Sequence, residues 1–474
     1  MFLAVQLQKL SDRDMLRFVW AEADAPAPDF YRFKTLPFGV VSSPFQAIWC
    51  LQEAAKMQKL KYPEAADIIL NMTYMDDIII VADSVSLTVK RLQEVLHILE
   101  HGGFYGHKIS ASDPRVLESL DSERTDPART VKILGLILDH DSGNFRFNVD
   151  EIFSSFISSP KKITRHLLVS LAARVFDTQG YVSPYVMQFK KLLPMLWHNQ
   201  TSWKEDLENR STLDDSGKKI PCPVAQEAVA RFKEWVEDIP KLKELQFPGF
   251  IGGPIEFVAI FGDASKTGIG VVAYAVTKAD TGATLSRIIY SKSSLMPKNL
   301  REKAKLEDAL TIARAELIAM VCCVTMMDYL REAYNPLLTS DKVVIFTDSL
   351  LNLQRIQRGK GKCKPFEERR VCKVLDGKGQ AVIRFCPGVE NPSDLPSRGC
   401  TLTELQDRMQ FWKEGPDFLK LPTSHWPKQP AISEKIKDDA SLDEQPVLYE
   451  DEIKLHTAQL IALQAEASAW RAMS

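Results

Sequence analysis

The pattern of apolar and polar residues is typical of strands in some segments of the chain and of helices in others. Short β-branched and aromatic runs predict strands at residues 1–6, 30–33, 71–81, 131–139, 144–149, 255–261, 271–276, 287–291, 342–349 and 381–386. Apolar residues at helical spacing predict helices at residues 47–60, 86–101, 164–180, 225–238 and 313–320, with another at 452–473. Residues 112–129 are polar and acidic, which predicts a loop. The chain therefore combines α+β and α/β regions in several domains.

Residues 71–81 place two adjacent carboxylates, Asp76 and Asp77, inside an apolar stretch. The β-branched residues on both sides predict a buried hairpin with residues 75–77 at its turn. Two packed carboxylates repel each other and lose hydration, so the pair is unfavourable for stability alone. A divalent cation would compensate, because hard oxygen ligands suit Mg²⁺. An ordinary acidic turn is the alternative interpretation.

The residues around this hairpin resemble reverse transcriptases. Residues 74–77 (YMDD) resemble the catalytic signature of that family, and residues 36–45 resemble the motif beside the incoming nucleotide and template. Residues 102–104 with Lys108, and then residues 134–136, resemble the two motifs that follow. The amino-acid sequences of these motifs are most similar to those of the Pao/BEL class of retrotransposon polyproteins. This resemblance implies metal ligands at Asp76 and Asp77, and substrate-binding residues at Tyr74, Phe38, Gly39, Ser43, Pro44 and Lys108.

The same resemblance places the first polymerase aspartate, and the fingers that grip the template, before Met1. Polymerase metal sites use that carboxylate to bridge both ions. Asp12 and Asp14 are the nearest acids, but they fall after the first strand and are interpreted as surface residues. We therefore expect the chain as written to be defective in polymerisation, either as a fragment of a longer polyprotein or as a truncated relic.

Residues 164–180, followed by the turn at 181–184, resemble the thumb helix of the Pao family, and a glycine at 180 is expected to end the helix. Basic residues gather at its start, where they either neutralise template phosphates or form a solvated helix end: Lys161, Lys162, Arg165 and His166. Three tryptophans of the connecting region are expected to be packing anchors: Trp197, Trp203 and Trp235.

The second half of the chain has the order strand–strand–strand–helix–strand–helix–strand, which resembles ribonuclease H. The resemblance matches four acids, in order, to the metal-binding carboxylates of that family: Asp263, Glu316, Asp348 and Asp394. Two Mg²⁺ ions on such a cluster support phosphodiester hydrolysis. Without metal the four carboxylates would repel, which predicts raised pKa values. Each acid alone also has an ordinary explanation; Asp348, for example, could cap the next helix.

Residues 391–399 also resemble the end of the Pao ribonuclease H region, which supports the assignment of Asp394. Two departures stand out: alanines occupy residues 313 and 315 of the helix that carries Glu316, and no histidine lies between Asp348 and Asp394. The densest basic run of the chain lies between these last two acids and either follows a hybrid backbone or forms a solvated loop: Arg355, Arg358, Lys360, Lys362 and Lys364.

Composition narrows the picture. The net charge is −2, so a nucleic-acid surface must be a local basic patch. The eight cysteines show no paired metal spacing, which fits reduced thiols in an intracellular protein, in a cytoplasmic particle or the nucleus. No apolar run of 18 residues and no signal peptide is evident, so we expect no membrane span and no secretion.

We therefore expect a partial reverse-transcriptase palm at 1–130, a thumb and connection at 131–250, a ribonuclease-H-like mixed five-stranded sheet with helices at 251–400, and a spacer with a flexible acidic tail at 401–474. The expected activity is hydrolysis of RNA in RNA–DNA hybrids with Mg²⁺, or with Mn²⁺ as the alternative ion. The expected partners are an RNA template, DNA, RNA–DNA hybrid and other parts of the same polyprotein. A non-catalytic nucleic-acid-binding remnant is the alternative.

Overall fold

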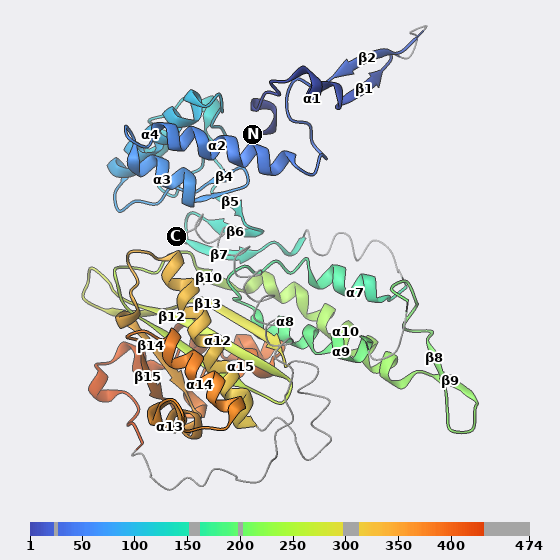
Figure 1. Cartoon of the computed structure of the whole chain (residues 1–474), viewed down its shortest axis with the longest axis vertical. Helices are drawn as coiled ribbons and strands as arrows, with labels where there is room; N and C mark the ends of the chain where they lie inside the picture. Colours follow the sequence, from blue (N-terminus) through green and yellow to red (C-terminus); the bar gives the residue numbers. More distant parts are fainter. Residues whose placement is uncertain (23–26, 151–161, 198–201, 297–311, 431–474) are drawn as a thin grey trace. The chain divides into compact units, whose positions relative to one another are not determined.

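The computed structural model describes residues 1–22, 27–150, 162–197, 202–296 and 312–430, and these divide into two compact units (Figure 1). The first unit runs from Met1 to Val131 and the second begins at Lys132. The expected acidic tail and its helix, together with Lys161, lie outside the described residues. The expected division into four domains stays a prediction.

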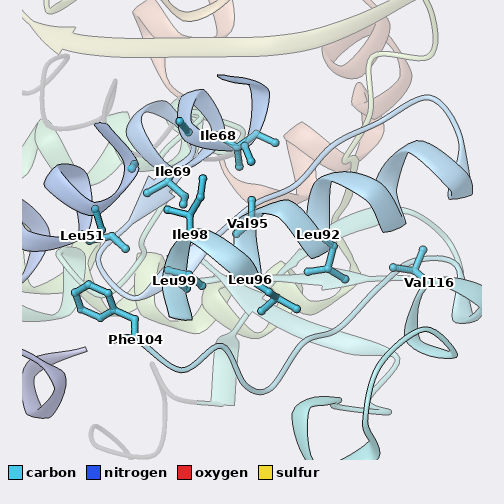
Figure 2. Packing of buried hydrophobic residues seen from close by; sticks show 14 residues of the cluster. Leu51, Ile68, Ile69, Leu92, Val95, Leu96, Ile98, Leu99, Phe104 and Val116 are labelled. Carbon is cyan, nitrogen blue, oxygen red and sulfur yellow. The ribbon is translucent and has the colours of Figure 1, made fainter. Parts of the chain in front are cut away.

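Three helices form the core of the first unit: α2 (Ser43–Gln58), α3 (Pro63–Asn71) and α4 (Val85–His101). The Ser84 hydroxyl accepts a hydrogen bond from the Leu87 amide and so begins α4 where the apolar period starts. The buried side chains face one another across the three helices (Figure 2): Leu51, Ile68, Ile69, Leu92, Val95, Leu96, Ile98 and Leu99, with Phe104 and Val116 from the following chain. The predicted apolar face of α4 is therefore core.

The carboxylate hairpin is present but is shorter and less buried than expected. Only β3 (Thr73–Tyr74) and β4 (Asp77–Ile78) pair, and in the described part of the chain no third strand joins them. With no further strand to cover it, the hairpin stays half-buried, and Asp76 and Asp77 are exposed. The partly buried Ile78 packs against the helical core. Helix α4 packs against α2 and α3 and covers no larger sheet among the described residues.

The beginning of the chain differs from its predicted strand. Residues Phe2–Ala4 form a 3₁₀ turn (η1), and Gln6 makes a single bridge to Thr35. The short helix α1 (Leu10–Asp14) leads into a ribbon of β1 (Arg17–Trp20) and β2 (Asp29–Arg32), the latter close to the predicted second strand. Asp14 forms ion pairs with Arg17 and Arg32, as a surface acid would.

Two further predictions for the first unit need correction. Helix α2 starts at Ser43 and ends at Gln58, so Leu60, the last residue of the predicted helix, lies beyond it and is fully exposed. The expected loop at 112–129 contains α5 (Pro114–Leu117) and the 3₁₀ turn η2 (Ser122–Arg124). Asp113 starts α5 by accepting the Arg115 amide, which a reading of polarity alone overlooks.

A small sheet opens the second unit, with the order β10-β7-β6-β5: β5 (Thr130–Ile133), β6 (Leu136–Asp139), β7 (Asn144–Phe147) and β10 (Gln246–Pro248). The predicted hairpin is confirmed, because Asp139 pairs with Asn144. Its first strand is broken at Leu134 and Gly135, which both have positive φ angles of 49° and 79°.

Helices follow: α7 (Arg165–Ala172), α8 (Ser183–Lys190), α9 (Leu192–Trp197) and α10 (Pro223–Asp238), with a β8 (Ser211–Leu213) and β9 (Lys219–Pro221) hairpin before α10. Helix α7 ends at Ala172, well before the predicted glycine stop. The reason is Asp177, whose carboxylate accepts the amides of Tyr181 and Val182 and so bends the chain into a turn ahead of α8.

The aromatic anchors of this region are confirmed only in part. The Trp235 ring is buried and stacks on Tyr185 with ring centroids 4.9 Å apart. Trp203 is 51% exposed, so the expectation of a packing anchor is wrong there. The side chain of Trp197 lies outside the described residues.

The main sheet has the strand order β13-β12-β11-β14-β15, which confirms the predicted mixed five-stranded sheet (Figure 1, yellow to orange). Strands β11 (Ile255–Ala264), β12 (Gly268–Lys278) and β13 (Thr284–Leu295) are antiparallel, whereas β14 (Val343–Thr347) and β15 (Val382–Phe385) run parallel to β11. Helix α12 (Ile312–Ala333) packs on β11 and β12 and is followed by α13 (Leu350–Arg358) and α14 (Pro365–Gly377).

After β15, α15 (Asp394–Arg398), α16 (Leu402–Asp407), α17 (Met409–Glu414) and the 3₁₀ turn η7 (Asp417–Lys420) continue the packed structure. The expected spacer is therefore folded as far as residue 430. Its Trp412 is fully buried, donates to the Tyr181 carbonyl and accepts the Tyr274 hydroxyl at its own carbonyl. Among the described residues no helix is long and apolar enough to cross a membrane.

Candidate carboxylate centre

Three acids from separate parts of the sequence meet at one edge of the main sheet. Asp263 lies near the end of β11, and Asp348 directly follows β14. These two strands are parallel neighbours, with Phe261 opposite Phe346, so their ends point the same way. Glu316 lies near the start of α12, which packs on β11. One carboxylate oxygen from each acid lies within 4.8 Å of the others.

Each of these carboxylates has a neutral side-chain partner. The Ser397 hydroxyl donates to Asp263 Oδ2 over 2.5 Å. Ser349 forms a side-chain hydrogen bond with Glu316, and Asn391 forms one with Asp348. All three partners are buried. They orient the acids without cancelling their charge, which leaves the negative field of the cluster in place.

Burial is the main cause of the raised pKa values of all three acids. It raises the pKa of Asp348 to about 6, with the charge of Asp263 as the next contribution. Burial likewise raises the pKa of Asp263 and of Glu316, and the Ser397 and Ser349 hydrogen bonds act against it. The direction matches the prediction that converging carboxylates without a cation disfavour their own ionisation.

One atom of the cluster points to an ion. Asp348 Oδ1 is buried and accepts no hydrogen bond from any described residue. Buried carboxylate oxygens are normally paired or coordinate a metal. The capping explanation for Asp348 does not apply, because Ser349 is the N-cap of α13 and accepts the Asn352 amide. A set of carboxylate oxygens fits a hard divalent cation. The three acids can therefore hold a metal ion.

The fourth predicted acid lies beside this group but is paired elsewhere. Asp394 is the first residue of α15, and its carboxylate forms an ion pair with Arg398 one turn later. Its charge contributes to the raised pKa of Asp263 and of Asp348, so it lies next to the centre. The structure brings three of the four acids into one group and leaves Asp394 at its side.

The polymerase-type acids have a different setting in the first unit. Asp76 lies at the hairpin turn after Met75, which has a positive φ of 52°, and Asp77 begins β4. Burial of Asp77, followed by the charge of Asp76, raises the pKa of Asp77. Within the described ranges, the one grouping of three or more possible metal ligands is Asp263, Glu316 and Asp348. The pair therefore has no third acid beside it in that part of the chain.

The predicted substrate-binding residues of the first unit are spread over several elements. Tyr74 is half-buried in β3, and Phe38 is 72% exposed. Gly39 and Lys108 occupy turns with positive φ angles of 87° and 55°. Ser43 and Pro44 form the first turn of α2, where Ser43 is buried. Their contacts with a substrate stay a prediction.

The basic residues proposed for nucleic-acid contact are only partly available. Arg165 is buried and donates to the Leu196 carbonyl, so it cannot reach phosphates on the surface. His166 and Lys162 are exposed. In the basic run that begins within α13, Lys360 pairs with Asp376, and Arg355 turns inward toward Glu367 at 3.8 Å. Phosphate binding by this run would rest on other members, such as Arg358 and Lys362.

The sequence did not single out the neutral partners Ser349, Asn391 and Ser397. Ser349 follows Asp348 directly, and the other two lie in the segment 391–399 that carries Asp394. Closeness to the acids in the sequence was therefore the feature that could have indicated these three residues. Which of the nearby hydroxyls and amides face the acids depends on the tertiary structure.

Three antiparallel strands, two further parallel strands and a carboxylate cluster at the ends of β11 and β14 define a ribonuclease-H-like domain. Residues 164–349 match the family described as Pao retrotransposon-like RNaseH-like domain. The similarity to Pao-type retrotransposon proteins that the motifs predicted is thus confirmed over this segment. The segment contains Asp263, Glu316 and Asp348 and also covers α7 to α10. No curated protein matches the chain.

The solved structures that this chain is similar to share little sequence with it. A foamy viral protease-reverse transcriptase in complex with double-stranded DNA is 14% identical with a TM-score of 0.46, covering 80% of this chain and 54% of its own. A foamy viral protease-reverse transcriptase in complex with an RNA/DNA hybrid is 15% identical with a TM-score of 0.44, covering 91% of this chain and 45% of its own. LC11-RNase H1, isolated from compost, is 20% identical with a TM-score of 0.21, covering 33% of this chain and 99% of its own. This chain spans about half the length of the two viral chains.

Proposed function

We propose that the second unit hydrolyses the RNA strand of RNA–DNA hybrids in a reaction that depends on Mg²⁺, with Mn²⁺ as the alternative ion. The observation that carries this proposal is the group Asp263, Glu316 and Asp348 with the unpaired, buried Asp348 Oδ1. The Pao match over 164–349 supports the same class of activity. Asp394 is proposed as the fourth metal ligand.

The chain's own residues prepare this centre in three ways. The sheet and α12 hold the three carboxylates within reach of one ion, and the ionised forms are the ones that bind it. Burial limits water at the acids and strengthens their field. Ser349, Asn391 and Ser397 fix the carboxylate planes. When bound, divalent metal would activate the attacking water and stabilise the leaving oxygen.

The proposed substrate is a hybrid whose backbone lies across the basic residues near α13. Arg358 and Lys362 carry positive charge for phosphates, whereas Arg355 and Lys360 are already paired with acids. Contacts of this kind weaken with salt because counterions are released on binding. We therefore expect hybrid affinity to fall steeply with ionic strength.

For the first unit we propose a partial reverse-transcriptase palm that is defective in polymerisation in the chain as given, followed by a thumb and connection at residues 131–250. Of the family's polymerase carboxylates, residues 1–474 contain the matches Asp76 and Asp77. Two acids supply fewer ligands than a two-metal polymerase site uses. An RNA template, DNA and other parts of a polyprotein are proposed partners of this region.

The test is cleavage of a labelled RNA–DNA hybrid by the purified full chain, with Mg²⁺ and with EDTA. The double variant Asp263→Asn/Asp348→Asn should lose cleavage while it keeps hybrid binding and melts, without metal, at the same or a higher temperature than the wild type. Asp341→Asn is the matched control, because Asp341 is a surface carboxylate just before β14, whereas Asp348 directly follows that strand. A folded wild-type chain that binds the hybrid but never cleaves it would favour the non-catalytic remnant instead.

A further inference from the structure

We propose that Ser397 is a positioning residue that fixes the carboxylate of Asp263 for metal binding. The inference rests on the proposed function and deepens it, because it assigns a role in the centre to a residue that has no charge. Ser397 lies on the last turn of α15, far from Asp263 in the sequence. The two side chains meet because α15 lies against both β12 and β11, the strand that carries Asp263.

The contact itself is short and buried. Ser397 is fully buried, and its hydroxyl oxygen lies 2.5 Å from Asp263 Oδ2. The same hydroxyl also lies 3.1 Å from the carbonyl of Asp394 in its own helix turn. A hydroxyl has one hydrogen to donate, and a carboxylate is the stronger acceptor. The shorter distance to Asp263 fits donation to the carboxylate.

Two glycines of β12 let the backbone of α15 approach closely. A Cβ on Gly270 would lie 2.4 Å from both the Ser393 carbonyl oxygen and the Ser397 amide nitrogen. A Cβ on Gly268 would lie 3.0 Å from the Ser397 carbonyl oxygen. The Ser265 hydroxyl donates to that same carbonyl over 2.9 Å. The backbone of Ser397 is thus fixed at both its amide, which donates to the Ser393 carbonyl, and its carbonyl, independently of the contact between its side chain and Asp263.

Helix α8 holds the other end of α15. The Cys400 amide donates to the Pro184 carbonyl over 3.2 Å, and Lys191 donates to the Arg398 carbonyl. A Cβ on Gly399 would meet the Pro184 carbonyl oxygen at 3.1 Å. Helix α15 is therefore fixed between β12 and α8, and the hydroxyl of Ser397 has little freedom to leave Asp263.

A neutral donor suits this position. An arginine or lysine would neutralise Asp263, whereas a hydroxyl orients the carboxylate and leaves its negative charge for a cation. Glu316 and Asp348 have partners of the same kind in Ser349 and Asn391. Partners that orient a metal ligand typically contribute about 10- to 100-fold to metal affinity or activity. Removal of the Ser397 hydroxyl should therefore weaken metal binding within that range.

The experiment measures Mn²⁺ binding to the full chain by electron paramagnetic resonance, together with the Mn²⁺ concentration that gives half-maximal hybrid cleavage. Ser397→Ala should raise both the Kd and this concentration by about 10- to 100-fold. Ser397→Cys keeps a weak donor of similar size and should fall between Ser397→Ala and the wild type. The matched control is Ser286→Ala, a buried serine on β13 whose hydroxyl has no hydrogen-bond partner among the described residues.

The outcomes separate this inference from the proposed function. If the wild type binds Mn²⁺ and cleaves, but Ser397→Ala has the same Kd, Ser397 only fills space and the inference is wrong. If the wild type binds no Mn²⁺, the proposed function fails and the inference fails with it. Should Ser397→Ala melt far below the control, a wild-type Kd for a well-folded Ser397→Cys would overturn the inference, and a raised Kd would support it.

Discussion

The two carboxylate sites of this chain differ in the scaffold that holds them. Asp76 and Asp77 are exposed on a hairpin of two-residue strands, and Asp77 has only Asp76 as a charged neighbour that raises its pKa. Asp263, Glu316 and Asp348 converge from separate elements and have neutral partners; Asp263 is buried, and Glu316 and Asp348 are half-buried. We call a site prepared when its acids are already held close together. An acidic motif in a sequence therefore becomes a prepared site only where strand ends and a helix bring several acids to one point.

The largest expected effect tests the prepared site. Glu316→Gln keeps the shape of the side chain but removes one ligand charge, so hybrid cleavage should fall by more than about 100-fold, beyond the loss typical of an orienting partner. The metal-free protein should melt at the same or a higher temperature, since one of three repelling charges is gone. Cleavage and differential scanning fluorimetry measure the two effects.

Glu332→Gln, an exposed change farther along α12, is the control and should alter neither property. A Glu316→Gln protein that cleaves at the wild-type rate would show that the three acids do not act together. A marked drop in its melting temperature would show that Glu316 stabilises the metal-free fold rather than straining it.

The next prediction concerns a change in the packing of α15 on β12 rather than a change in the acids. Gly270→Ala places a Cβ 2.4 Å from two backbone atoms, one in α15 and one in Ser393 just before it, and backbone cannot move aside as a side chain can. We expect a destabilisation of about 1–3 kcal/mol, as is typical of overpacking, together with weakened Mn²⁺ binding. Urea unfolding and metal titration measure both.

Gly282→Ala is the comparison variant. Its Cβ meets open space, and it carries only the strain of a left-handed backbone with φ of 83°. It should lose some stability and no Mn²⁺ affinity. If Gly270→Ala also keeps the wild-type Kd for Mn²⁺, the close approach of α15 to β12 has no role in the site.

A smaller effect should appear in the dependence of stability on pH. The pKa of Asp348 in the folded protein is about 6, raised from 3.8. The folded state therefore holds the proton more tightly than the unfolded state, so the stabilising contribution of protonation is present below pH 4 and is lost as the pH rises through about 6. Metal-free wild type should be less stable than Asp348→Asn at pH 7.5, and this difference should close toward pH 4.

Thermal melts of both proteins in EDTA across this range provide the measurement. The comparison with Asp348→Asn cancels the titration of groups away from the cluster, several of which shift in the opposite direction, such as Asp113. A difference between the two proteins that does not change with pH would contradict the raised pKa.

The sequence predicted the order of the main strands and the acids at their ends because hydrophobic period and motif spacing are local properties. It could not predict that Ser397 faces Asp263, since that contact depends on the close approach of α15 to β12. It also placed the end of α7 too late, because the Asp177 turn competes with the helical period. The fold of residues 401–430 could not be predicted, because Trp412 donates its hydrogen bond to the carbonyl of Tyr181, which lies far away in the sequence.

The smallest expected effect concerns the exposed pair. Asp76→Asn/Asp77→Asn should leave hybrid cleavage by the full chain unchanged, because neither residue belongs to the group at Asp263, and should alter stability by no more than about 0.5 kcal/mol, as surface substitutions usually do. The direction should be toward higher stability, since the two acids repel each other and partial burial raises the pKa of Asp77. Urea unfolding and the hybrid cleavage assay check both statements. A loss of cleavage in this double variant would mean that the first unit contributes to the reaction of the second, and the contrast between an unprepared pair and a prepared centre would no longer hold.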